Sequence, residues 1–127
     1  FSPLANWNVS NVTDLSVMFQ NLVIKSFEPF RNWNVKNVTT LQNTFNSHED
    51  YAVITNLEPL KNWDVSNVKN FRRAFSDISS LTDASGINNW NISKDANFND
   101  MFVLCPVRPT FTKVAGTWTS SGTFVPS

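Results

Sequence analysis

The stretch that decides the fold reads Pro59-Leu60-Lys61-Asn62-Trp63-Asp64-Val65-Ser66-Asn67-Val68. Lightly altered copies of it recur along the chain, and a tryptophan marks each copy. These tryptophans are Trp7, Trp33, Trp63, Trp90 and, in a degenerate fifth copy, Trp118. Their spacings are 26 residues (7 to 33), 30 (33 to 63), 27 (63 to 90) and 28 (90 to 118). A period of this length is typical of proteins built from repeated structural units, and of solenoids in particular.

Apolar residues change their spacing within each copy. With the tryptophan as position zero, apolar side chains stand at −3, 0 and +2, and then at +5, +8 and +12. The two-residue step is the period of a strand, whereas the later steps of three and four are the period of one helix face. Each copy therefore predicts a short strand followed by a turn or two of helix, with Thr13 and Thr39 as helix N-caps.

The predicted fold class is an α/β solenoid, a leucine-rich-repeat-like stack of short parallel strands on one face and short helices on the other, with a C-terminal β-hairpin cap. A single domain is expected over residues 1–127. The predicted repeats cover about 1–26, 27–56, 57–83 and 84–110, and the cap covers 111–127. The second repeat carries a polar surface insertion at 46–51, which contains His48.

The cap is predicted from a change of composition after Phe111. Val, Thr, Trp and Phe favour strands, and Ser120-Ser121-Gly122 supplies turn chemistry. We expect a strand at 117–119, a turn at Ser121-Gly122 and an antiparallel return at 123–125. Phe124 is then laid over the end of the core.

Composition excludes several classes of function. The 127 residues carry no net charge, so the chain has no basic stripe with which to bind nucleic acid. Its single cysteine, Cys105, cannot form an internal disulfide and is expected to be small and buried. The sequence has no apolar run long enough for a membrane span. Because Phe1 already lies inside a repeat, the chain is expected to be a fragment or a processed form of a longer protein.

Residues 7 to 19, Trp-Asn-Val-Ser-Asn-Val-Thr-Asp-Leu-Ser-Val-Met-Phe, resemble a bacterial surface-protein repeat. That family of unknown function occurs in mycoplasma lipoproteins and in wall-anchored proteins of Gram-positive bacteria, and it is related to BspA-like leucine-rich repeats. The resemblance covers residues 1 to about 111, with departures at Thr44, Ala74 and Asp95. It implies a secreted or cell-surface-anchored module used in adhesion or host contact, and it carries over no catalytic residue.

A polar face is predicted to bind the partner, which is expected to be a host protein or a glycan. If tryptophan and valine point inward, the residues that alternate with them point outward. The candidate binding residues are Asn8, Asn34, Lys36, Asp64 and Asn91.

The alternative use of the repeated asparagines is structural. Side-chain amides can bond to one another and to the neighbouring backbone. This ladder interpretation applies to Asn32, Asn62, Asn11, Asn37 and Asn67. The inward phase of the tryptophans likewise predicts core packing rather than sugar stacking, with Trp118 as the exception.

No enzyme motif, metal-ligand spacing or cofactor motif emerges, and no enzymatic activity is expected. The leading hypothesis is a monomeric binding and adhesion module of a bacterial surface protein. The alternative is a stalk or spacer that presents another domain and binds nothing itself.

Overall fold

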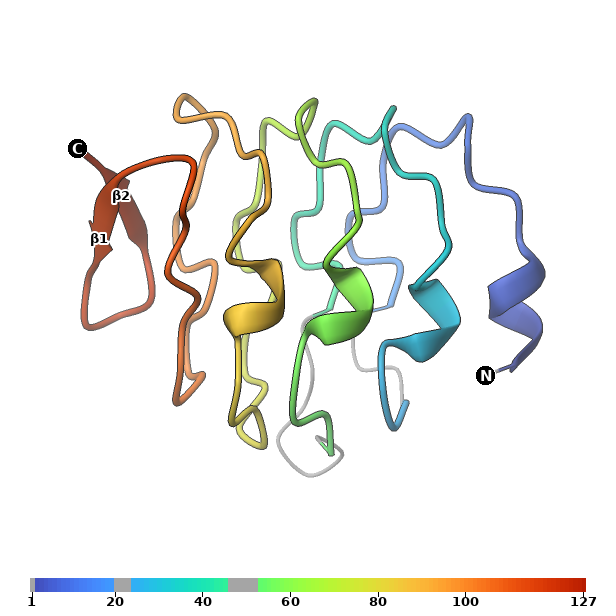
Figure 1. Cartoon of the computed structure of the whole chain (residues 1–127), viewed down its shortest axis with the longest axis horizontal. Coiled ribbons are helices and arrows are strands. Elements are labelled where there is room, and N and C mark those ends of the chain that lie inside the picture. The colour runs from blue at the N-terminus through green and yellow to red at the C-terminus, as the bar shows by residue number, and fades with distance from the viewer. Residues whose placement is uncertain (1, 20–23, 46–52) are drawn as a thin grey trace.

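The computed structural model describes residues 2–19, 24–45 and 53–127, so the insertion around His48 lies outside the described residues (Figure 1). The described part contains short 3-10 helices and one two-stranded sheet. The helices are η1 (Ser2–Asn6), η2 (Glu28–Phe30), η4 (Glu58–Leu60) and η5 (Ser85–Ile87). The strands are β1 (Gly116–Trp118) and β2 (Phe124–Pro126). In Figure 1 the helices follow one another along the long axis, and the two termini lie at opposite ends.

Proline occupies the start of η2 and of η4. Pro29 and Pro59 stand in the first positions of the two helices, where a fixed φ and a missing N–H are tolerated. Each helix lasts one turn, and the next turn is closed by the Trp33 and Trp63 backbone N–H groups. In η5, Gly86 takes the place of proline, and a side chain there would lie 2.6 Å from the Glu58 Cα atom. Glycine therefore permits the close approach of η5 to η4.

Neighbouring copies are joined by isolated parallel bridges rather than by a sheet. One row of bridges links Asp14 to Thr40, Thr40 to Asn70, and Asn70 to Asn97. Backbone bonds flank the bridges, including Phe71 N–H to the Asn97 carbonyl at 2.7 Å. These pairings begin seven residues after the tryptophan, whereas the predicted strand begins at the tryptophan itself.

The predicted α/β solenoid, and with it the leucine-rich-repeat-like stack of strands and helices, is wrong. In the described residues the only sheet is a two-stranded antiparallel one, and each 3-10 helix has three to five residues. Apart from isolated bridges, the rest of the described chain consists of turns, bends and irregular segments.

Backbone geometry explains why the predicted helices do not form. The tenth residue after each of the first four tryptophans has a positive φ, between 51° and 56°. Left-handed backbone interrupts a right-handed helix after a single turn. The residues concerned are Val17, Asn43, Arg73 and Asp100.

The predicted inward phase of the apolar residues is confirmed for the central copies. Trp33, Trp63 and Trp90 are buried, as are the phenylalanines that stand twelve residues after each of the first four tryptophans. Phe45 and Phe75 stack with ring centroids 5.7 Å apart, and Phe75 and Phe102 stack at 5.0 Å. The core prediction is wrong for Trp7, whose side chain is 52% exposed.

Each buried tryptophan also makes a polar contact with the preceding copy. The indole N–H of Trp33 donates to the Leu4 carbonyl at 2.9 Å, and that of Trp63 donates to the Phe30 carbonyl at 2.9 Å. The Trp90 indole repeats the bond to the next carbonyl in the series at 2.8 Å. Each of these tryptophans therefore packs in the core and also forms a hydrogen bond to the preceding copy.

The predicted C-terminal hairpin is confirmed, with both strands shifted by one residue. β1 and β2 pair antiparallel, with Thr117 opposite Val125. Gly122 has a φ of 90°, and a Cβ there would lie 2.5 Å from the Phe102 carbonyl carbon. Phe124 is buried and meets Phe98 edge to face at a centroid distance of 5.3 Å. The hairpin thus covers the end of the core.

Candidate binding surface

The candidate side chains directly after the tryptophans close tight turns. Asn8 Oδ1 accepts the Ser10 backbone N–H at 3.1 Å, and Asn34 Oδ1 accepts the Lys36 N–H at 3.2 Å. Asp64 Oδ1 accepts the Ser66 N–H at 3.1 Å. Asparagine and aspartate favour such turns because their short side chains reach the backbone two residues on. The bonds fix the orientation of each side chain.

The bonds from asparagine to backbone that the ladder interpretation predicted are confirmed for two residues. Asn37 Nδ2 donates to the Ser10 carbonyl at 2.8 Å, and Asn67 Nδ2 donates to the Lys36 carbonyl at 2.6 Å. These bonds tie each turn to the turn of the preceding copy. The prediction is wrong for Asn32 and Asn62, which are exposed and make no ladder bond in the part of the chain that the structure describes.

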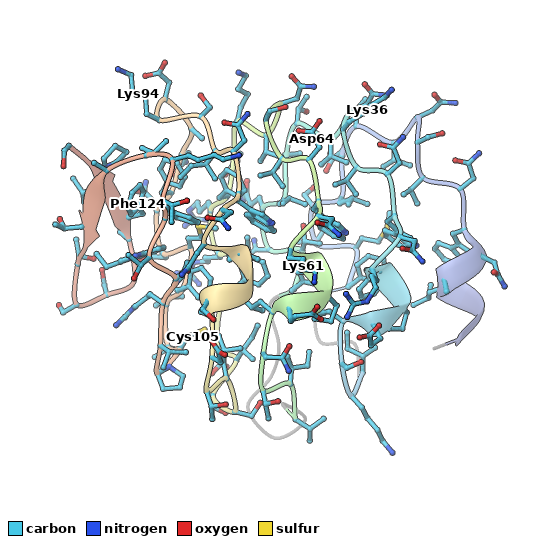
Figure 2. All side chains as sticks on the ribbon, viewed as in Figure 1. Lys36, Lys61, Asp64, Lys94, Cys105 and Phe124 are labelled. Carbon is cyan, nitrogen blue, oxygen red and sulfur yellow. The ribbon has the colours of Figure 1, made fainter. Side chains whose placement is uncertain are left out.

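All five candidate residues are exposed, and we call them the corner row: Asn8, Asn34, Lys36, Asp64 and Asn91. Figure 2 shows Lys36 and Asp64 on one edge of the molecule, together with Lys94. Lys94 was missed by sequence reasoning, although its place in the fourth copy matches that of Asn37 and Asn67. The row therefore combines amides, a carboxylate and one ammonium group, and Lys94 adds a second ammonium group on the edge that holds Lys36 and Asp64.

Hydrogen bonds keep the carboxylate of the row ionised. The Ser66 side chain and backbone N–H lower the pKa of Asp64, and the charge of Lys36 lowers it further. Asn91 differs from the other corner residues because its side chain makes no hydrogen bond with the described residues. Turn bonds thus hold the Asn8, Asn34 and Asp64 side chains of the corner row, whereas the Lys36 and Asn91 side chains are less constrained.

Two further sets of corners use the same turn chemistry. Asp14 Oδ1 accepts the Ser16 N–H at 2.7 Å, and Asn70 Oδ1 accepts the Arg72 N–H at 2.9 Å. Before the tryptophans, Asn56 and Asp83 accept backbone N–H groups in the same way. The predicted N-caps at Thr13 and Thr39 are therefore wrong, since a turn oxygen lies one residue later and no helix follows. This repeated use of turns accounts for five of the 18 asparagines.

Sequence reasoning also missed a charged cluster on η2 and η4. Arg31 bonds both Glu28, at 2.5 Å, and Glu58, while Lys61 pairs with Glu58 at 3.0 Å. The Arg31 guanidinium, followed by Lys61, lowers the pKa of Glu58 to about 2. The signal in the sequence was the repeated Glu-Pro-x-Arg or Glu-Pro-x-Lys, in which the two charges stand three residues apart.

The other candidate groups have structural roles. Cys105 is buried, as predicted, and its thiol donates to the Phe75 carbonyl at 2.7 Å. Burial raises the pKa of the thiol to about 11, so it is not an activated nucleophile.

The described residues hold no cluster of three or more His, Cys, Asp or Glu side chains that could bind a metal. Among these residues, no helix has the length and apolar composition needed to cross a membrane.

The repeated copies and their polar corners define a class of repeat sequence that presents short polar side chains to solvent. The chain belongs to the family of Mycoplasma proteins of unknown function designated DUF285, which matches residues 1–118. The resemblance to a mycoplasma repeat family is therefore confirmed. No curated protein and no solved structure matches the chain.

Proposed function

We propose that the chain is an extracellular binding module of a bacterial surface protein, and that it contacts a host protein or glycan through the corner row. The observation that carries the proposal is the fixed orientation of exposed polar groups. In Asn8 and Asn34 the turn uses the side-chain oxygen, which leaves the amide N–H₂ free to donate. In Asp64 the turn uses one carboxylate oxygen, and the second is left to accept.

Fixed polar groups suit recognition because little freedom remains to be lost on binding. Ordering a flexible side chain at an interface costs roughly 0.5–1.5 kcal/mol, and a side chain already held by a turn avoids part of that cost. Lys36 adds a positive charge next to Asp64, and Lys94 adds another on the same edge (Figure 2). Paired donors and acceptors of this kind match the hydroxyls of a sugar or the polar rim of a protein.

The proposed relationship to BspA-like proteins and the surface location rest on the sequence pattern. They do not rest on fold, because the described residues lack the strands and helices of leucine-rich repeats.

The test changes the exposed atom at two corners while keeping the turn. Asn34→Asp and Asp64→Asn each retain an oxygen for the backbone N–H, and together they exchange a donor and an acceptor. We expect the double variant to lose at least tenfold in affinity, about 1.4 kcal/mol, for any ligand that the parent chain binds. Binding is measured on glycan arrays and on immobilised host extracellular-matrix glycoproteins.

Asp14→Asn is the matched control, because it makes the same chemical change at a corner outside the row. It should leave affinity unchanged. A parent chain that binds no glycan, no matrix glycoprotein and no host cell supports the stalk instead. Equal losses in the control and in the double variant would place the contact outside the corner row.

A further inference from the structure

The first copy exposes groups that the later copies bury. Trp7 is 52% exposed, whereas Trp33, Trp63 and Trp90 are exposed by 5% or less. Met18 is 47% exposed, yet Thr44, Ala74 and Met101, which stand at the same place in the later copies, are fully buried. Val17, beside Met18, is 53% exposed. We call this surface the N-terminal face: Trp7, Asn11, Thr13, Val17 and Met18.

Hydrogen-bond donors on the N-terminal face match donors that are used between later copies. The Asn37 side chain reaches back to a carbonyl of the preceding copy, and Asn67 does the same. The Thr39 backbone N–H donates to the Thr13 carbonyl at 2.8 Å, and the Lys69 N–H donates to the Thr39 carbonyl at 2.7 Å.

The corresponding donors of the first copy have no such bond. The Trp7 indole, the Asn11 amide and the Thr13 backbone N–H donate to no acceptor within residues 2–19, 24–45 and 53–127. Apolar exposure and free donors therefore coincide on one face. In the second and third copies the same three groups bond carbonyls of the preceding copy, which specifies the backbone that fits here.

The opposite end of the molecule cannot supply that backbone. The Phe102 N–H bonds the Gly122 carbonyl of the hairpin at 3.0 Å, and the Asp100 N–H bonds Thr123 Oγ1 at 2.9 Å. The loop between β1 and β2 thus occupies the groups that the fourth copy would offer to a following one. The C-terminal end of a second copy is therefore closed and cannot dock against this face in the way that one copy follows another within the chain.

We propose that the N-terminal face is an interaction surface for one further unit of this chain's own sequence pattern, carried ahead of Phe1 on the same polypeptide. The unit supplies carbonyls to the Trp7 indole, the Asn11 amide and the Thr13 N–H. Its apolar side chains cover Trp7 and Met18. A glycan fits less well, because the free donors match those that bond the backbone carbonyls of a preceding copy elsewhere in the chain.

The experiment fuses a copy of residues 57–83 directly ahead of Phe1. This join keeps the register, because residues 1, 27, 57 and 84 each lie six positions before a tryptophan. Indole hydrogen exchange is followed by NMR, with acrylamide quenching of tryptophan fluorescence as a second readout. We expect exchange at Trp7 to slow by about tenfold or more, toward that of Trp33, while the copied tryptophan becomes the fast one.

A fusion with the same residues in scrambled order is the matched control and should leave Trp7 exchanging rapidly. Unchanged exchange at Trp7 in the ordered fusion overturns the proposal, whether or not the added copy acquires protected amides. Protection of Trp7 that rises with concentration in the unfused chain also overturns it, because the occupant is then a second molecule.

Discussion

At the scale of single residues, the buried tryptophans join each copy to the copy before it. The Phe30 carbonyl accepts the backbone N–H of Trp33 at 3.1 Å and the indole N–H of Trp63 at 2.9 Å. Leu60 does the same for Trp63 and Trp90. Both lone pairs of a buried carbonyl are thereby satisfied, so neither oxygen carries a desolvation cost.

Replacing Trp63 by Ala should therefore cost about 3–5 kcal/mol of unfolding free energy, the range for a large aromatic side chain truncated in a core. The variant also leaves the second lone pair of the Phe30 carbonyl unpaired. Urea denaturation followed by far-UV circular dichroism measures the loss. Trp7→Ala is the control and should cost far less, because that side chain is half exposed. Equal losses at both positions would contradict the assigned packing.

The core residues could be predicted from the sequence because apolar side chains recur at fixed places after each tryptophan. The positive φ of Val17 and Arg73 could not, since neither residue type favours left-handed backbone. Asn43 and Asp100 tolerate left-handed backbone better. Because only two of the four residues are of such a type, the sequence did not predict the repeated positive φ. The corner residues were predicted as exposed groups, whereas their turn bonds were not.

At the scale of elements, η2 and η4 show why the predicted strand and helix do not form. Apolar spacing of two residues fits a strand, but it also fits a 3-10 turn followed by an extended segment. Proline at the start of η2 and η4 favours the turn. Spacings of three and four fit one helix turn as well as a helix, and sequence spacing alone does not reveal where the backbone reverses hand.

The charged cluster that links η2 to η4 should make stability depend on acid pH. The folded-state pKa of Glu58 is about 2, below the usual 4.5, so its contribution is fully present above the unfolded value. The contribution is lost as pH falls from 4.5 toward 2. We expect the melting temperature of the parent chain to decline across this window.

Glu58→Gln removes the ionisable partner of Arg31 and Lys61 and should flatten the decline. Other acids, including Asp14 and Asp83, also have a lowered pKa and keep part of the slope. Melting curves at several pH values compare the two chains. Identical slopes for parent and variant would show that the cluster contributes nothing to stability.

At the scale of the whole molecule, the two ends differ. The C-terminal hairpin buries Phe124 and places Trp118 against Phe102, with ring centroids 5.4 Å apart. The N-terminal face leaves Trp7 and Met18 open. The sequence predicted the closed end because strand-forming residues flank a Ser-Gly turn. The exposure of Trp7 was missed because the pattern of the first copy is the same as that of the buried ones.

Deleting residues 117–127 should expose Phe98, Phe102 and Phe111 at the closed end. The loss of buried aromatic surface is expected to cause aggregation or a broad thermal transition, measured by light scattering and circular dichroism. Val125→Thr is a control, because this half-exposed side chain tolerates a polar substitute without loss of the hairpin. A soluble truncated chain with the parent's melting temperature would show that the hairpin is dispensable.

The turns of the corner row keep the same backbone shape whether the side chain is neutral or charged. Asn8 and Asp64 hold the same kind of backbone bond, yet one presents an amide and the other a carboxylate. Exchange of a single atom group therefore alters the local charge by one unit and leaves the path of the chain unaltered. Substitutions between asparagine and aspartate at these positions can therefore change which ligands the surface attracts or repels. Such a change requires no matching change in the core.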